Sequence, residues 1–347
     1  MLKKIFLILA IVAGLVWFYY WYVRGINLLL DEPVDYPPPY SWATRIPADK
    51  GADVSISAWT QAAPMPTART GAAAAALGDE IYVIGGLDGF GRTVATVEVF
   101  DTKANSWRTA APLSIAIHHA AAAAVAGRVF VMGGEEGLSS SPVNSVFSYD
   151  PGRNEWRSLA DLPKERGGAS AVVVDGKVHL LGGSNRLEIL DSHLVFDPAI
   201  GQWTSGEPMP SGRDRLVAVI HDRLLWAVGG RGGSTLYNLN DAVAMDLESG
   251  RWADPVAMTT PRSAFAAAAD GRVYVFGGET ATSVISSIET FDPSSMAWET
   301  LAPMPHPRYG AAFAQVGERV FIIGGSARVG FSVSDLNEVY ELPPRQP

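Results

Sequence analysis

The chain has no cysteine among its 347 residues. Disulfide bonds, thiol nucleophiles and thiolate metal ligands are therefore all excluded. Basic residues are also few, since 27 Lys and Arg stand against 36 Asp and Glu, and the formal net charge is −9. No run rich in Lys or Arg follows residue 24, and nucleic-acid binding depends on neutralising phosphates. The composition therefore argues against a nucleic-acid partner.

One long apolar run lies near the N-terminus, where residues 5–23 read IFLILAIVAGLVWFYYWYV. At ~1.5 Å per residue, a helix of this length spans roughly the hydrocarbon core of a bilayer. The stretch from Trp17 to Tyr22 is entirely aromatic, which is typical of a membrane–water interface. We predict a transmembrane signal-anchor helix here; a cleaved signal peptide and a buried helix are the alternatives.

The basic residues around this run predict its orientation. Lys3 and Lys4 precede it, whereas Arg24 alone follows it before several acidic residues. Because positive residues near a span stay in the cytoplasm, we expect a single-pass membrane protein with its larger part in the periplasm or outside the cell. The predicted segments are a cytoplasmic stub at 1–4, the anchor at 5–23, a Pro-rich tether at 24–53, a folded domain at 54–343 and a tail at 344–347.

Beyond the tether, two residue types recur in phase. The first is glycine, which occurs as a pair directly after a short apolar run. Successive glycine pairs are 47 to 49 residues apart. The pairs are Gly85-Gly86, Gly133-Gly134, Gly182-Gly183, Gly229-Gly230, Gly277-Gly278 and Gly324-Gly325. A tryptophan recurs with them, at Trp59, Trp107, Trp156, Trp203, Trp252 and Trp298. A period near 50 residues with strand-like content indicates a repeat array whose units stack to bury their faces.

One unit, from Arg69 to Trp107, contains four strand-like runs: TGAAAAAL, EIYVIGG, TVEVFD and TKANSWRTAAP. Four strands make one propeller blade, so six glycine pairs predict an all-β, six-bladed β-propeller. The last unit ends at Leu342 without a tryptophan strand, while an unpaired one around Trp59 precedes the first unit. We therefore predict that residues near 55–62 pair with residues near 336–342 and close the ring.

These units resemble kelch repeats over about residues 54–342, through the pattern GG…FDP…W and a PMP-x-x-R step. In kelch propellers of the ubiquitin-ligase adaptor type, arginines at this step bind acidic partner segments at the channel mouth. The resemblance implies the same place for the step arginines, which are Arg69, Arg166, Arg213, Arg262 and Arg308, and for the additional Arg215. The alternative is structural: each step arginine hydrogen-bonds loop carbonyls or pairs with an acid of the next blade.

The residue after each glycine pair belongs to the same mouth by this resemblance. These residues are Leu87, Glu135, Ser184, Arg231, Glu279 and Ser326. Because Glu135 and Glu279 partly neutralise the arginines, a sugar or polar peptide fits the mouth as well as an acidic ligand does.

The second unit departs from the pattern, with Ile117, His118 and His119 at the step. Two adjacent histidines on an extended strand point to opposite faces, so this pair is predicted not to share a metal ion. We expect no metal site, no cofactor and no catalytic residue. Of the two histidines, we place only His119 at the channel mouth.

The sequence thus predicts a membrane-anchored, non-catalytic module that binds a protein or a glycan at the propeller mouth. A carbohydrate-active enzyme, such as a sugar mutarotase of the sialic acid type, is the first alternative, because kelch propellers include an exported six-bladed enzyme of that kind. An arginine and a carboxylate within about 4 Å of each other in a deep pocket would favour it. A structural scaffold of an envelope complex is the second alternative.

Overall fold

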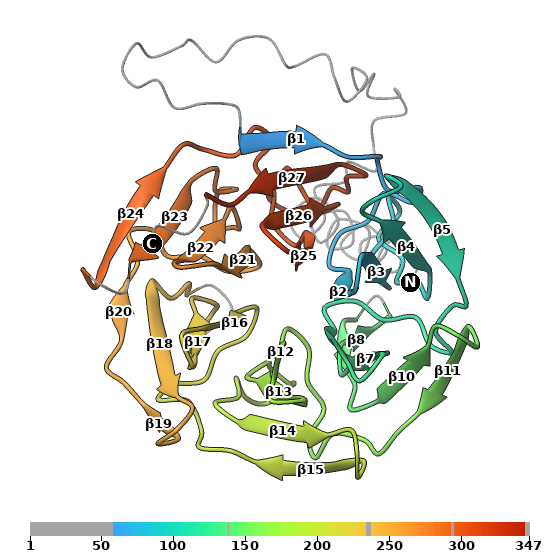
Figure 1. The fold of residues 1–347 in the computed structure, drawn as a ribbon, viewed down its shortest axis with the longest axis horizontal. Helices are drawn as coiled ribbons and strands as arrows, with labels where there is room; N and C mark the ends of the chain where they lie inside the picture. Colours follow the sequence, from blue (N-terminus) through green and yellow to red (C-terminus); the bar gives the residue numbers. More distant parts are fainter. Residues whose placement is uncertain (1–57, 138, 234–236, 293–294, 344–347) are drawn as a thin grey trace, which may run out of the picture. The chain divides into compact units, whose positions relative to one another are not determined.

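The computed structural model describes residues 58–137, 139–233, 237–292 and 295–343. The described residues do not include the predicted stub, anchor, tether or tail. No helix within the described part has the length and apolar character needed for a membrane span. The described part contains six antiparallel blade sheets arranged in chain order around a common axis, and one separate two-stranded hairpin (Figure 1). This arrangement confirms the predicted all-β, six-bladed propeller.

The first three blades each contain four strands in sequential order from the axis outward. Blade 1 contains β2 (Ala73–Leu77), β3 (Glu80–Ile84), β4 (Val97–Asp101) and β5 (Ser106–Ala110). Blade 2 contains β6 (Ala121–Val125), β7 (Arg128–Met132), β10 (Val146–Asp150) and β11 (Glu155–Ser158), with a separate hairpin of β8 (Glu135–Glu136) and β9 (Ser141–Pro142). Blade 3 contains β12 (Ser170–Val174), β13 (Lys177–Leu181), β14 (His193–Asp197) and β15 (Gln202–Ser205).

Blades 4 and 5 repeat this order, and blade 4 has one additional short strand. Blade 4 contains β16 (Val217–His221), β17 (Leu224–Val228), β18 (Asp241–Asp246), β19 (Arg251–Trp252) and β20 (Val256–Ala257). Blade 5 contains β21 (Ala266–Ala269), β22 (Val273–Phe276), β23 (Ile288–Asp292) and β24 (Ala297–Leu301).

Blade 6 joins the two ends of the repeat region. Its inner strands are β25 (Ala312–Val316), β26 (Arg319–Ile323) and β27 (Asn337–Glu341), and its outer strand is β1 (Trp59–Gln61). Trp59 pairs with Tyr340 and Gln61 with Glu338, so the predicted closure by an N-terminal strand is present in the structure. This pairing covers the edge that β27 would otherwise expose.

In five of the six blades the recurring tryptophan packs on an aromatic residue of the neighbouring strand, whereas Trp252 of blade 4 lies opposite Met245. The ring centroids of Phe100 and Trp107 are 5.0 Å apart, and those of Phe196 and Trp203 are 4.9 Å apart. In blade 6 the strand supplied by the N-terminal side makes the same contact, with Trp59 5.0 Å from Tyr340. The FD…W pattern is therefore a cross-strand aromatic pair, repeated to hold the outermost strand of a blade in place.

The glycine pairs are explained by a close approach between neighbouring blades. A Cβ on the first glycine of each pair would lie only 2.2 to 2.7 Å from the carbonyl oxygen of the step residue in the next blade. The second glycine donates its N–H to that same carbonyl, as Gly86 does to Ile117 and Gly134 to Arg166. Both glycines also have positive φ. No other residue type meets both conditions, so the pairs recur in every blade.

Candidate functional site

The five step arginines are buried within their blades and do not line the channel. Their exposed fractions are between 0 and 2%. Each donates Nη1 hydrogen bonds to the carbonyl of the first glycine of its own blade, at 2.7 Å for Gly85 and 2.8 Å for Gly324. Four of them also pair with an acid of the same blade, namely Glu98, Asp241, Glu289 and Glu338. The geometry matches the structural alternative, except that each acid belongs to the arginine's own blade.

Blades 2 and 3 show how this interior pair varies. Arg166 has Ser192 in place of an acid, and burial lowers the pKa of its guanidinium to about 10. In blade 2 the step residue is Ile117, and Phe147 belongs to the same apolar cluster. An apolar pair thus occupies in blade 2 the place that an ion pair occupies in blades 1, 5 and 6.

The channel mouth is built instead by the residue two positions after each step. Six residues with φ between 49° and 65° form what we call the mouth ring: Gly71, His119, Gly168, Arg215, Ala264 and Gly310. Each donates its backbone N–H to the carbonyl of the ring residue in the preceding blade, at 2.7 to 3.0 Å, and the last connection runs from Gly71 to Gly310. The six hydrogen bonds therefore make a closed circle around the axis. Below it, a channel of about 370 Å³ is lined by the Ala-rich innermost strands.

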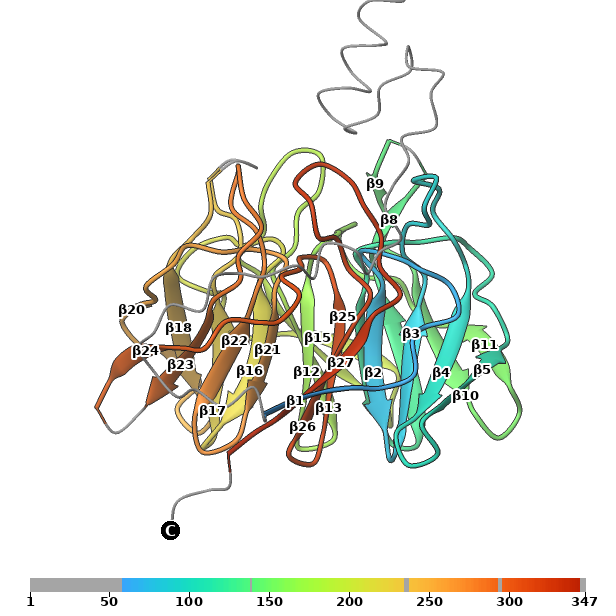
Figure 2. The same cartoon turned by 90° about the horizontal axis from the view of Figure 1, so that it is seen from above.

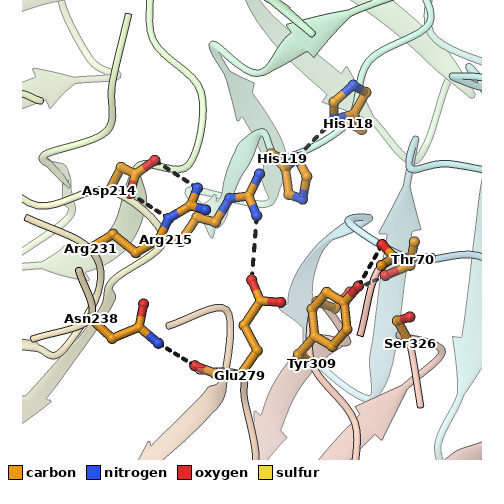
Figure 3. Close-up of polar contacts among 12 residues, drawn as sticks. Thr70, His118, His119, Asp214, Arg215, Arg231, Asn238, Glu279, Tyr309 and Ser326 are labelled. Atoms are coloured by element: carbon orange, nitrogen blue, oxygen red, sulfur yellow. Dashed lines mark hydrogen bonds and ion pairs between the residues drawn. The ribbon is translucent and has the colours of Figure 1, made fainter. Parts of the chain in front are cut away.

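Only two mouth-ring residues have long side chains, and each lies over a glycine of the preceding blade. A Cβ on Gly71 would lie 2.9 Å from Nε2 of His119, and one on Gly168 would lie 3.1 Å from Cγ of Arg215. The two glycines therefore make room for the imidazole and the guanidinium. Figure 3 shows both side chains directed toward the space between the blades.

A mixed-charge cluster surrounds Arg215. Its Nη1 lies 3.5 Å from Oε1 of Glu279, and Arg231 pairs with Asp214 at 3.1 Å (Figure 3). Burial raises the pKa of Glu279, although the charges of Arg215 and Arg231 oppose this shift. Asn238 donates to the carbonyl oxygen of Glu279. The structure thus brings together three of the predicted mouth residues, and it adds Asp214 and Asn238, which the sequence interpretation did not select.

The second cluster contradicts a prediction. His118 and His119 do not point to opposite faces, because the left-handed φ of 49° at His119 turns the chain out of the extended conformation. Their Nδ1 atoms lie 2.8 Å apart, and each lies 3.6 Å from Oε2 of Glu135. Among the described residues, these three form a group whose ligand atoms all lie within 4.8 Å of one another, close enough to hold one metal ion. The statement that the two histidines could not share a metal ion was therefore wrong, and His118 was missed.

The environment of this cluster fixes its charges. Burial and the neighbouring His119 lower the pKa of His118 to about 3, so its imidazole is neutral at physiological pH. Burial alone would raise the pKa of Glu135, but the neighbouring His119 and the charge of Arg215 lower it to about 2. The cluster therefore combines an ionised carboxylate with a neutral imidazole.

Apolar side chains surround the mouth at the loop tips. Phe90 is 80% exposed and Leu187 is 93% exposed, and Tyr237 and Val329 are also exposed. All four lie in loops that follow a glycine pair, at the end of the ring where β8 and β9 project in Figure 2. The other exposed large hydrophobics among the described residues, Ile200 and Met296, lie in turns before the outermost strands, at the opposite end.

The fold and this repeated architecture define a six-bladed β-propeller with a polar mouth. A model of the KLHDC2/KLHL20/DRC7 Kelch-repeats domain matches residues 52–230 and 204–325. Because these matches cover more than half of the chain, the protein belongs to the kelch-repeat β-propeller family. Kelch propellers are commonly protein-interaction modules.

Individual relatives match parts of the chain. Kelch-like protein 40 of Xenopus laevis is 28% identical over 160 residues, which are 46% of this chain and 25% of the relative. Alpha-scruin of Limulus polyphemus is 29% identical over 156 residues, 42% of this chain and 17% of that protein. Kelch repeat and BTB domain-containing protein 13 of Homo sapiens is 34% identical over 99 residues, 28% of this chain and 22% of the relative. The chain thus spans a quarter or less of the length of these relatives.

A solved structure of YjhT has the same fold. It superposes with a TM-score of 0.69 at 18% identity, over 79% of this chain and 95% of that chain. At this identity the likeness concerns the fold alone.

Proposed function

We propose that this protein is a membrane-anchored kelch propeller whose mouth face binds a protein partner outside the cytoplasm. The anchor and its orientation rest on the apolar run at residues 5–23 and on the basic residues before it. The observation that carries the binding function is the mouth face itself. It combines exposed apolar loop tips with the partly buried charges of Arg215 and Glu279 at its centre. Apolar and aromatic side chains around a few desolvated polar groups are typical of protein interfaces.

A photo-crosslinking amino acid at the loop tips tests this surface. It is introduced into the full-length chain at Phe90, Leu187 or Tyr237, and for comparison at Ile200 or Met296. We expect the same partner to be crosslinked from the mouth positions and to be absent from the two control positions, because all five side chains are exposed and apolar but only the first three surround the mouth. Equal capture from all five positions, or capture from the control positions alone, would contradict the proposal.

Arg215→Gly, analysed in the same experiment, separates the charges from the apolar tips. Gly occupies the equivalent place in three other blades, so the backbone conformation is retained. We expect the crosslinked band to weaken at least threefold, because the partner loses the central guanidinium. Unchanged crosslinking would show that the loop tips bind without it.

A second candidate function has a specific observation in its favour. The 3.5 Å pair of Arg215 and Glu279 at the channel end meets the distance expected for a sugar mutarotase, and burial raises the pKa of the carboxyl, as suits proton transfer. This candidate predicts faster anomerisation of reducing sugars, including N-acetylneuraminic acid, measured by NMR exchange. Glu279→Gln should then lower the rate by about 100-fold or more. Rates equal to those in buffer for the wild-type protein would exclude it.

A further inference from the structure

The three polar atoms of the blade 2 cluster lie around one common point. The Nδ1 atoms of His118 and His119 are 2.8 Å apart, and both are 3.6 Å from Oε2 of Glu135. A triangle with these sides has a centre about 2.0 Å from each corner. This equals the length of a Zn–N or Zn–O bond, which is about 2.0 to 2.2 Å. The atoms can therefore contact a single ion with little movement of the side chains.

Two glycines of the flanking blades make the space for these side chains. A Cβ on Gly167 would lie 2.5 Å from both Cγ and Oε1 of Glu135. A Cβ on Gly71 would lie 2.9 Å from Nε2 of His119. Any larger residue at position 167 would therefore obstruct the carboxylate, and any larger residue at position 71 would obstruct the imidazole of His119.

We propose that the mouth of blade 2 is a binding site for one divalent transition-metal ion, with Nδ1 of His118, Nδ1 of His119 and Oε2 of Glu135 as ligands. Two imidazoles and one carboxylate suit Zn²⁺, Fe²⁺, Ni²⁺ or Cu²⁺ rather than Mg²⁺ or Ca²⁺. Three protein ligands leave a further coordination position for water or for a group of a bound molecule. Because His119 lines the channel, that position is reached from the mouth. The inference goes beyond the proposed partner binding, which requires no metal.

The short contact between the two histidines is a hydrogen bond in which one Nδ1 carries the proton. Both Nδ1 lone pairs are needed to bind a metal, so on binding the proton leaves that nitrogen and the ring becomes the Nε2–H tautomer. The existing hydrogen bond already holds the two rings in place, which lowers the cost of organising the site.

Titration of the full-length, tag-free and chelator-treated protein with Co²⁺ and Zn²⁺ tests the site. We expect one equivalent of Co²⁺ to produce a visible d–d absorption band that one equivalent of Zn²⁺ removes. Glu135→Gln and His119→Asn are each expected to weaken binding at least tenfold. Gln keeps the shape of Glu, and Asn tolerates the left-handed φ at position 119, so both variants retain the fold. Melting curves followed by circular dichroism check that each variant is folded.

Two further variants separate a specific site from general histidine binding. His306→Gln removes a histidine that pairs with Glu338 in blade 6, and it should leave the stoichiometry and affinity unchanged. Gly167→Ala keeps all three ligands, and because the φ of Gly167 is not left-handed, the backbone accepts alanine. Its methyl group would displace the Glu135 carboxylate, so we expect weaker metal binding. Absence of one-equivalent binding by the wild-type protein, or unchanged affinity in both Glu135→Gln and His119→Asn, would overturn the proposal. Neither result depends on a partner, so either is distinguishable from failure of the proposed function.

Discussion

Deletion of residues 58–62, which include β1, is expected to lower the melting temperature of the propeller by about 6 to 12 °C. The deletion removes the three residue pairs between β1 and β27 and exposes the outer edge of blade 6. It also removes Trp59, whose ring packs at 5.0 Å from Tyr340 and 6.2 Å from Phe276 of blade 5. Loss of a packed tryptophan costs about 3 kcal/mol or more, and each kcal/mol corresponds to roughly 2 to 4 °C for a domain of this size.

Differential scanning calorimetry of the full-length chain measures this effect. Gln61→Ala is the matched control, because Gln61 lies on the same strand with an exposed side chain and should leave the melting temperature within about 1 °C. Trp59→Ala should produce much of the loss. If the deletion melts at the wild-type temperature, β1 does not hold the ring closed.

The second large effect concerns the buried ion pair of blade 5. Arg262 and Glu289 have no exposed side-chain surface and are bonded to each other. Arg262 also donates to the carbonyls of Gly277 and Ser287. Arg262→Ile leaves the carboxylate buried without its partner, so we expect a loss of about 3 to 5 kcal/mol in the free energy of unfolding.

Blade 2 supplies the control for this prediction, because Ile117 and Phe147 occupy there the places of the arginine and the acid. The double variant Arg262→Ile/Glu289→Phe removes both charges and should regain part of the loss, since apolar residues often replace a buried ion pair at little cost. Urea unfolding followed by tryptophan fluorescence gives the three free energies. A double variant no more stable than Arg262→Ile would contradict the prediction, because removal of the unpaired carboxylate would then regain nothing.

The architecture was predictable because its signals are imposed by the backbone. The glycine pairs recur since a carbonyl of the next blade leaves no room for a Cβ. The tryptophans recur since each covers a large apolar side chain on the neighbouring strand, an aromatic residue in five blades and Met245 in blade 4. Such constraints act in every repeat, and for this reason the sequence shows both the number of blades and the closing strand.

The direction of the step arginines was not predictable from the step motif alone. An arginine beside a channel can reach the solvent or turn into its blade, and the choice depends on carbonyls contributed by distant residues. A signal was nevertheless present within the repeats. Glu98 and Glu289 occupy the same place in strands β4 and β23, whereas the unit without a step arginine has Phe147 there. The signal is partial, because Leu194 and Val243 occupy this place in units that keep the arginine, and it indicates contact only for the units with a glutamate.

The metal geometry was missed because the alternation of side chains was applied to a residue outside an extended strand. Nothing in two adjacent histidines shows that the second has a left-handed conformation. Comparison of the repeats does show it, because Gly71, Gly168 and Gly310 stand at the place of His119 in other units. Glycine at three of six equivalent positions indicates positive φ.

The mouth ring has a consequence for how this surface can change. Its circle is made entirely by main-chain N–H and C=O groups, so the side chains at its six positions contribute nothing to its connectivity. Glycine, alanine, histidine and arginine all occupy these positions in one molecule. Residues that accept a left-handed backbone can therefore be exchanged at positions 119, 215 and 264 without loosening the blades. At the three glycines of the ring a Cβ would lie only 2.8 to 3.0 Å from an atom of a neighbouring blade, so these positions stay glycine. The propeller thus offers three substitution points on a constant main-chain circle, through which selection or protein engineering can alter ligand preference while the scaffold stays constant.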